Sequence, residues 1–297
     1  MNNQELFFEQ EQQTPLTPYI SISQVNGIIG EQFDQLGVAT KTYEKHHNNP
    51  NSEYYGLSID EICDRWTDKA NKSKYYGSLL DDYIGYNLNN DQMGLEMFLL
   101  DHDRDSDERL DMICKSYDEF ISDFLSKHPE IKFVTREKTI YYQLENPMFD
   151  ESKEQSLDNS KYWYIKGRLD ALFYNTLTNH YINIDWKSSD KIEHQPNKWT
   201  KRLLGPCSSL YDMDWYKYTI QVYFYKTALE NGKYLPNGSI VDCYIVQLPG
   251  HKITENNDKM YFIHQPAFQY DLDFMKRIFI YAHKKNILTS KINASKM

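Results

Sequence analysis

An aspartate and a lysine lie two positions apart at the end of an apolar stretch, in "YINIDWKSSDK" from Tyr181 to Lys191. The alternation of apolar and polar residues predicts a β-strand, in which residues two apart share a face. Ile182 and Ile184 then point one way, and Asp185 and Lys187 point the other. A carboxylate can ligate Mg²⁺ or Mn²⁺, and an ammonium can orient a water or offset developing negative charge. This strand face therefore carries the groups for metal-assisted hydrolysis.

A second acid, Asp170, follows "KGRL" in the preceding predicted strand. If the two strands are hairpin neighbours, Asp170 and Asp185 can approach each other. Two adjacent carboxylates are costly unless a cation lies between them. We therefore predict a site for one or two Mg²⁺ or Mn²⁺ ions held by Asp170, Asp185 and the backbone carbonyl of Trp186, with Lys187 beside it.

This arrangement resembles the PD-(D/E)xK nuclease superfamily, in which successive strands carry a Glu, an Asp and an (Asp/Glu)-x-Lys. The matching residues are Glu137 in "FVTREKTIYY", Asp170 in "GRLDAL" and Asp185 to Lys187 in "DWK". Glu145 is a rival for the position of Glu137. The spacing between Asp170 and Asp185 fits two short strands and a turn.

Further residues resemble the RecB-like branch of that superfamily. Gln221 and Tyr225 in "QVYFY" form its Gln-x-x-x-Tyr pattern, on one face of a predicted helix. The resemblance covers about residues 131–230 and extends more loosely to the N-terminal helices. One residue departs from the pattern, since Asp81 stands where the branch often has a ligand His after a Gly-Thr/Ser pair. Asp81 could supply an oxygen ligand instead, or the site could have lost a ligand and be weakened.

The resemblance implies an α/β fold, with a restriction-endonuclease-like core whose mixed central sheet is flanked by helices and a mainly helical N-terminal region. It also implies a metal-dependent phosphodiester hydrolase acting on single- or double-stranded DNA, with exonuclease action favoured and a role in recombination or repair. The expected catalytic residues are Lys187, Asp185, Asp170, Glu137, Gln221 and Tyr225. The alternative is a catalytically weak or inactive protein of this fold that binds nucleic acid or a partner protein.

The chain of 297 residues has a net charge of −10, which argues against a general nucleic-acid coat protein. One segment differs, because residues 187–202 contain five basic and two acidic residues. Beside a hydrolytic site, such a segment could contact the phosphates of a substrate. We therefore predict a nucleic-acid-binding track, composed of Lys191, Lys198, Lys201 and Arg202.

The sequence pattern divides the chain into a polar tail at 1–18, a helical region packed on the core at 19–130 and the nuclease core at 131–297. Strands are expected at 131–144, 162–174, 180–188, 238–249 and 259–268, with helices at 215–232 and 271–286. Within the helical region, Gly77 is expected to end one helix. The order of elements predicts an α/β core with helical decoration.

The four cysteines are far apart and form no CxxC pair, which predicts free thiols and no iron–sulfur cluster. No apolar run reaches the roughly 18 residues of a membrane span, and the N-terminal residues lack the pattern of a secretory signal. We expect a protein that does not contact membranes and is cytoplasmic, in the host cytoplasm if a phage encodes it. The many tyrosines have A/T-rich codons, and such a codon bias would suit a phage or its host.

Overall fold

The computed structural model describes residues 19–102, 106–154, 156, 159–250 and 259–294. The predicted tail at 1–18 lies outside these residues. The chain divides into two compact units, a sheet unit formed by Met1–Glu31 with Lys115–Met297 and a helical unit formed by Gln32–Cys114.

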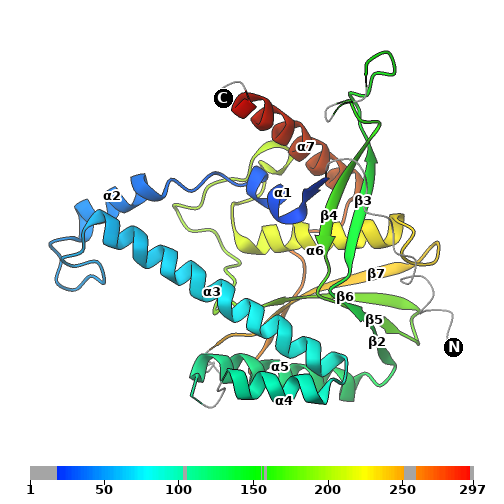
Figure 1. Cartoon of the computed structure of the whole chain (residues 1–297), viewed down its shortest axis with the longest axis horizontal. Coiled ribbons are helices and arrows are strands. Elements are labelled where there is room, and N and C mark those ends of the chain that lie inside the picture. Colours follow the sequence, from blue (N-terminus) through cyan, green and yellow to red (C-terminus); the bar gives the residue numbers. More distant parts are fainter. Residues whose placement is uncertain (1–18, 103–105, 155, 157–158, 251–258, 295–297) are drawn as a thin grey trace. The chain divides into compact units, whose positions relative to one another are not determined.

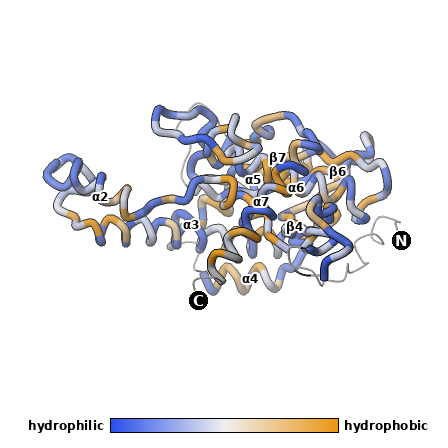
Figure 2. The backbone as a smooth tube through the Cα atoms, turned by 90° about the horizontal axis from the view of Figure 1, so that it is seen from above, coloured by the Kyte–Doolittle hydropathy of each residue, from blue (hydrophilic) through white to orange (hydrophobic). Residues whose placement is uncertain are grey.

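The helical unit contains α2 (Gln35–His46), α3 (Ile59–Leu88), α4 (Gln92–Asp101) and the start of α5 (Glu108–Lys127). The Ser58 side chain accepts the backbone N–H of Glu61 in a capping box, which fixes the start of α3. The expected end at Gly77 is wrong, because α3 continues through this residue to Leu88. Apolar residues three or four apart after Gly77 are buried and stabilise the helix there. Figure 2 shows apolar and polar colours alternating along α2 and α3.

The sheet unit is built on a five-stranded mixed sheet in the order β2-β5-β6-β7-β8. Its strands are β2 (Ile131–Arg136), β5 (Ala171–Asn175), β6 (His180–Lys187), β7 (Ile240–Gln247) and β8 (Phe262–His264). β6 and β7 run parallel, and the other neighbours are antiparallel. A parallel pair needs a long crossover connection, and the helix α6 (Asp214–Asn231) lies within it.

A smaller sheet of three strands has the order β1-β4-β3. It contains β1 (Tyr19–Ser21), β4 (Tyr162–Arg168) and β3 (Thr139–Glu145), and Figure 1 shows β3 and β4 side by side as long arrows. Buried and accessible residues alternate along β3 and β4, so that one face packs on the core and the other meets solvent.

The two sheets are joined where a long hairpin bends. The single strands expected at 131–144 and 162–174 are each two strands, β2 with β3 and β4 with β5. Glu137 has a left-handed backbone with φ of 51°, and its N–H lies 3.4 Å from the carbonyl oxygen of Asp170. Leu169 N donates to Lys138 O at 3.1 Å on the other side. Both arms of the hairpin therefore pass from one sheet to the other at the same level, which places Asp170 at the bend.

Helices cover both faces of the five-stranded sheet. The ring of Phe120 in α5 meets the ring of Trp186 in β6 edge-on, with centroids 5.4 Å apart. α6 packs on β6 and β7 from the other side, as Figure 1 shows, and nine of its residues are buried. Gly167 in β4 allows a close approach of α6, because a Cβ there would lie 2.3 Å from a ring atom of Phe224.

Two more helices complete the sheet unit. α1 (Ile22–Ile29) and α7 (Leu272–Ala294) contact each other and α6, and a short 3-10 helix η1 (Gly205–Cys207) packs on α7. All four cysteines are free. The protein thus has the α/β class expected from its sequence, with mixed sheets packed against helices. No helix in the described ranges has both the length and the apolar character needed to span a bilayer.

Candidate active site

Asp185 and Lys187 lie at the carboxyl end of β6, on the face that α6 covers. The Lys187 Nζ lies 2.7 Å from the Asp185 Oδ2, and the Asp185 side chain is fully buried. Burial alone would lower the pKa of Lys187, but the carboxylates of Asp185 and Asp170 outweigh burial and raise this pKa. Lys187 is therefore a fixed positive charge at neutral pH.

Asp170 joins this pair from the bend between β4 and β5. Its Oδ2 accepts the backbone N–H of Trp186 at 2.9 Å, just beyond the point where the β5–β6 ladder ends at Ala171 and Ile184. Burial, and then the negative charge of Asp185, raise the pKa of Asp170 to about 7. The bend thus brings a second buried carboxylate near Asp185 and Lys187.

Glu137, the third expected acid, lies across the bend from Asp170. Its carboxylate is 3.1 Å from the Arg136 guanidinium and 3.7 Å from that of Arg168. The rival Glu145 ends β3 at the far end of the hairpin, opposite Tyr162. Of the two, Glu137 is the one that the fold places next to Asp170 along the backbone, although its side chain pairs with arginines.

Gln221 and Tyr225 connect α6 to the bend. The Tyr225 hydroxyl donates to Arg168 O at 2.7 Å and accepts from Gln221 Nε2 at 3.1 Å. Burial, followed by the charges of Asp170 and Asp185, raises the pKa of Tyr225 well above its usual value. Tyr225 is therefore a neutral donor that fixes the backbone two residues before Asp170.

Sequence reasoning missed two side chains next to Lys187. The Lys187 Nζ lies 4.6 Å from the ring centroid of Tyr218, one turn before Gln221 on α6. Gln247 is the β7 residue in register with Lys187, and its Nε2 donates to Ser189 O at 2.9 Å. The spacing of Tyr218 from Gln221 and Tyr225 on one helix face was a usable signal. The position of Gln247 depends on the parallel pairing of β6 and β7, for which the sequence carries no local signal.

Gln247 also tethers the loop after β6 to β8. Its Oε1 lies 2.8 Å from His264 Nε2, and the His264 ring meets the His194 ring edge-on at 4.8 Å. His194 in turn stacks on Trp215 with centroids 4.2 Å apart. These contacts hold the start of the predicted basic track against α6 and β8.

The residues of the basic track differ in what they contact. Lys191 is paired with Glu193 at 2.7 Å, and Lys201 is paired with Glu31. The Arg202 guanidinium lies over the ring of Tyr211, 3.8 Å from its centroid. Lys198 lies over the ring of Trp199, which is 78% exposed. Lys198 thus lies beside an exposed aromatic ring, whereas Lys191 and Lys201 are paired with acids.

Asp81 belongs to the helical unit, in α3, four residues after Gly77. It is partly buried and has an interaction partner. Its role as a metal ligand stays a prediction.

Asp170 and Asp185 are the side chains that would hold the expected metal. Among the residues that the structure describes, no three His, Cys, Asp or Glu side chains gather as a metal-binding group. Asp170 and Asp185 form an oxygen pair whose repulsion a divalent cation would relieve, and this repulsion adds to burial in raising the pKa of Asp170. The pair therefore fits Mg²⁺ or Mn²⁺ in donor type and charge, with the Trp186 carbonyl as the expected third ligand.

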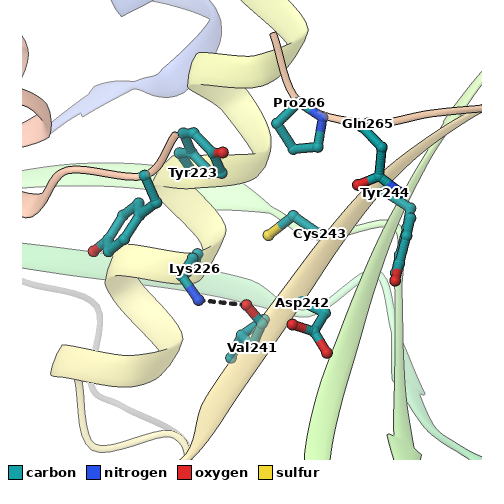
Figure 3. A pocket seen from close by; sticks show the side chains of 9 residues that line it. Tyr223, Lys226, Val241, Asp242, Cys243, Tyr244, Gln265 and Pro266 are labelled. Atoms are coloured by element: carbon teal, nitrogen blue, oxygen red, sulfur yellow. Dashed lines mark hydrogen bonds between the residues drawn. The ribbon is translucent and has the colours of Figure 1, made fainter. Parts of the chain in front are cut away.

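A separate cleft of about 240 Å³ lies near the start of β7, beside α6 (Figure 3). Its polar groups are already engaged. The Lys226 Nζ bonds to Glu230 and to Val241 O, and Asp242 pairs with His180 at 3.0 Å. Burial raises the pKa of the Cys243 thiol to about 12, so that it is not a nucleophile at neutral pH. The candidate catalytic groups, Asp185 and Lys187, lie instead at the other end of the parallel strands β6 and β7.

Comparison with known proteins adds no family to this description. No protein-family model matches the chain, and a search of curated proteins finds no significant match.

Proposed function

We propose that this protein is a divalent-metal-dependent nuclease that hydrolyses phosphodiester bonds, with DNA as its expected substrate. One observation carries the proposal. A bend in the hairpin brings Asp170 to the end of β6, where Asp185 is buried and paired with Lys187. Two acids and a lysine in this relationship have the charges that metal-assisted phosphoryl chemistry requires. The residue pattern of the RecB-like nucleases, with Gln221 and Tyr225, supports the same reading.

Each side chain has a role that follows from its contacts. Asp170 and Asp185 would hold Mg²⁺ or Mn²⁺, which when bound polarises a phosphate and lowers the pKa of water. Lys187, held by Asp185 and the Tyr218 ring, directs a permanent positive charge to the site. Such a charge stabilises the additional negative charge of the transition state. Tyr225 keeps the bend, and with it Asp170, in place.

The resemblance favours a restriction-endonuclease-like core and exonuclease action, and both belong to the proposal. The test is incubation of the purified protein with end-labelled single-stranded, double-stranded and closed circular DNA, with Mg²⁺, with Mn²⁺ and with EDTA. We expect cleavage that requires metal and a free end. Metal-dependent cutting of closed circular DNA would support a nuclease but show that it acts as an endonuclease.

A second candidate is a protein of this fold that binds nucleic acid without cutting it. The observation in its favour is that Asp185 is already neutralised by Lys187, and that no third acid joins the pair in the described part of the chain. DNA binding without cleavage under any of the metal conditions would select this candidate.

A further inference from the structure

The solvent face of the three-stranded sheet carries an unusual set of side chains. On the opposite face of β3 and β4 the apolar side chains are buried, for example Ile140, Trp163 and Ile165. The residues between them are accessible and are largely aromatic or basic. We call this surface the tyrosine face, and it consists of Tyr19, Tyr141, Tyr162, Tyr164, Lys166 and Arg168.

The aromatic rings of the tyrosine face are neighbours. Tyr19 of β1 is in register with Tyr164 of β4, and Lys166 is in register with Tyr141 of β3. The Tyr19 and Tyr141 rings meet edge-on with centroids 5.9 Å apart. The Lys166 Nζ lies 4.7 Å from the Tyr19 ring centroid. Tyr19, Tyr141 and Lys166 are thus in contact with one another, and Tyr164 lies next to Tyr19 by strand register.

The charge of the patch is opposite to that of the whole protein. The chain carries −10, yet Lys166 and Arg168 are the charged residues of β4 on this face and both are basic. The acid on the same face is Glu145, at the hairpin end of β3. Glu137 approaches Arg168 at 3.7 Å and offsets part of its charge, so the positive charge of this face rests mainly on Lys166, whose Nζ lies over the Tyr19 ring.

Along the backbone, the tyrosine face ends two residues before Asp170. The Arg168 carbonyl accepts the Tyr225 hydroxyl, and Asp170 follows two residues later. From Tyr162 to Arg168 the strand extends about 20 Å, at about 3.3 Å per residue. A polymer lying along β4 in this direction would thus arrive at the bend that carries Asp170.

We propose that the tyrosine face binds a single-stranded segment of nucleic acid and leads it to Asp170 and Asp185. Tyrosine rings offer π-faces to unpaired bases, and the basic side chains offer charge to phosphates, which is the combination used by proteins that bind single strands. A duplex keeps its bases stacked inside and gains nothing from the rings. The binding surface is inferred from the contacts of its own side chains. That it guides the nucleic acid toward a cleavage site rests on the proposed function.

The first test measures binding of a short labelled oligothymidylate in EDTA, so that cleavage does not enter. Tyr19→Leu combined with Tyr164→Leu removes two rings while keeping apolar volume on the strands. We expect the affinity to fall by about tenfold or more, because each base stacked on an aromatic ring contributes strongly. The matched control is Tyr55→Leu, which changes a tyrosine of the helical unit that is 56% exposed and should leave affinity unchanged.

The second test uses Lys166→Gln, which keeps most of the side-chain length and removes the charge. The dependence of affinity on salt should become shallower, since one phosphate contact is lost. This variant decides the matter if the double leucine variant does not fold. The proposal is overturned if a folded double variant and Lys166→Gln both bind the oligonucleotide like the wild type. It is also overturned if the double variant loses duplex binding to the same degree as single-strand binding.

These results separate the inference from the proposed function. If both variants bind normally and metal-dependent cleavage is intact, the proposed role of the tyrosine face is rejected and the nuclease proposal is retained. If the variants bind more weakly but the wild type cleaves under no condition, the tyrosine face is retained as a surface for single strands and the nuclease proposal is rejected.

Discussion

The ammonium of Lys187 lies 2.7 Å from the carboxylate of Asp185, whose side chain has no exposed surface. This ion pair has a structural and a chemical consequence. Breaking one partner of a buried pair leaves the other charge uncompensated, at a cost of about 3 to 5 kcal/mol. Under the proposed function, the same contact holds the lysine beside the phosphate of the substrate.

Lys187→Ala should therefore reduce both the stability of the fold and the rate of cleavage. Added Mn²⁺ distinguishes the two effects. We expect single-turnover cleavage to fall about 10²- to 10³-fold, while Mn²⁺ and DNA still bind. Mn²⁺ should raise the melting temperature of the variant more than that of the wild type, because a cation then compensates Asp185. Lys226→Ala is the matched control, since it breaks the Lys226–Glu230 pair of α6 away from the site. Cleavage by Lys187→Ala within a few-fold of wild type would show that Asp-x-Lys is a coincidence of strand composition.

Tyr225→Phe should destabilise the bend. The change removes the hydroxyl that donates to Arg168 O and leaves this partly buried carbonyl without that donor. The expected loss in the free energy of unfolding is about 1 to 3 kcal/mol, measured by urea denaturation. Tyr55→Phe, at an exposed position, should change it by less than about 0.5 kcal/mol. Equal stability of the two variants would remove Tyr225 from the account of how Asp170 is positioned.

The basic track should contribute unequally to DNA binding. Lys198 lies over Trp199 at the surface, whereas Arg202 lies over Tyr211 and Lys201 is paired with Glu31. Lys198→Ala should weaken DNA binding and flatten its salt dependence more than Arg202→Ala does. Titrations at several salt concentrations measure both effects. An unchanged salt slope after replacement of Lys198, Lys201 and Arg202 together would make the loop a solvated connection.

His283 should make the fold sensitive to acid. It is 4% exposed, its ring stacks on Trp163, and its Nε2 donates to Tyr164 O at 3.0 Å. Burial lowers its pKa to about 4, although the hydrogen bond acts in the opposite direction. Between about pH 6.5 and 4 the unfolded chain takes up a proton that the folded protein does not, so that the free energy of unfolding falls as pH falls.

The contribution of His283 over this range is at most about 3 kcal/mol. His283→Gln has no titrating ring, so the difference in unfolding free energy between wild type and variant should shrink or reverse as pH falls from 6.5 to 4. Urea titrations of both proteins across this range give that difference. A difference independent of pH would show that the ring titrates alike in the folded and unfolded protein.

The sequence predicted the local part of the site better than the part set by distant elements. The alternation in "YINIDWK" placed Asp185 and Lys187 on one face, and an antiparallel β5–β6 pairing does bring the neighbourhood of Asp170 to β6. The bend at Glu137 was not predicted, because its left-handed backbone follows from two hairpin strands changing sheet together. Gln247 was missed because its place beside Lys187 arises from a crossover through α6.

The most direct measurement compares wild type with Asp185→Asn in metal-dependent cleavage of end-labelled DNA, alongside Mn²⁺ titration. The amide keeps the shape of the side chain but lacks the negative charge, and Asp170 remains as a counter-charge for Lys187. We predict that the wild type degrades DNA only with Mg²⁺ or Mn²⁺, and that folded Asp185→Asn binds Mn²⁺ weakly and leaves the DNA intact. Equal cleavage by wild type and folded Asp185→Asn would contradict the assignment of this site.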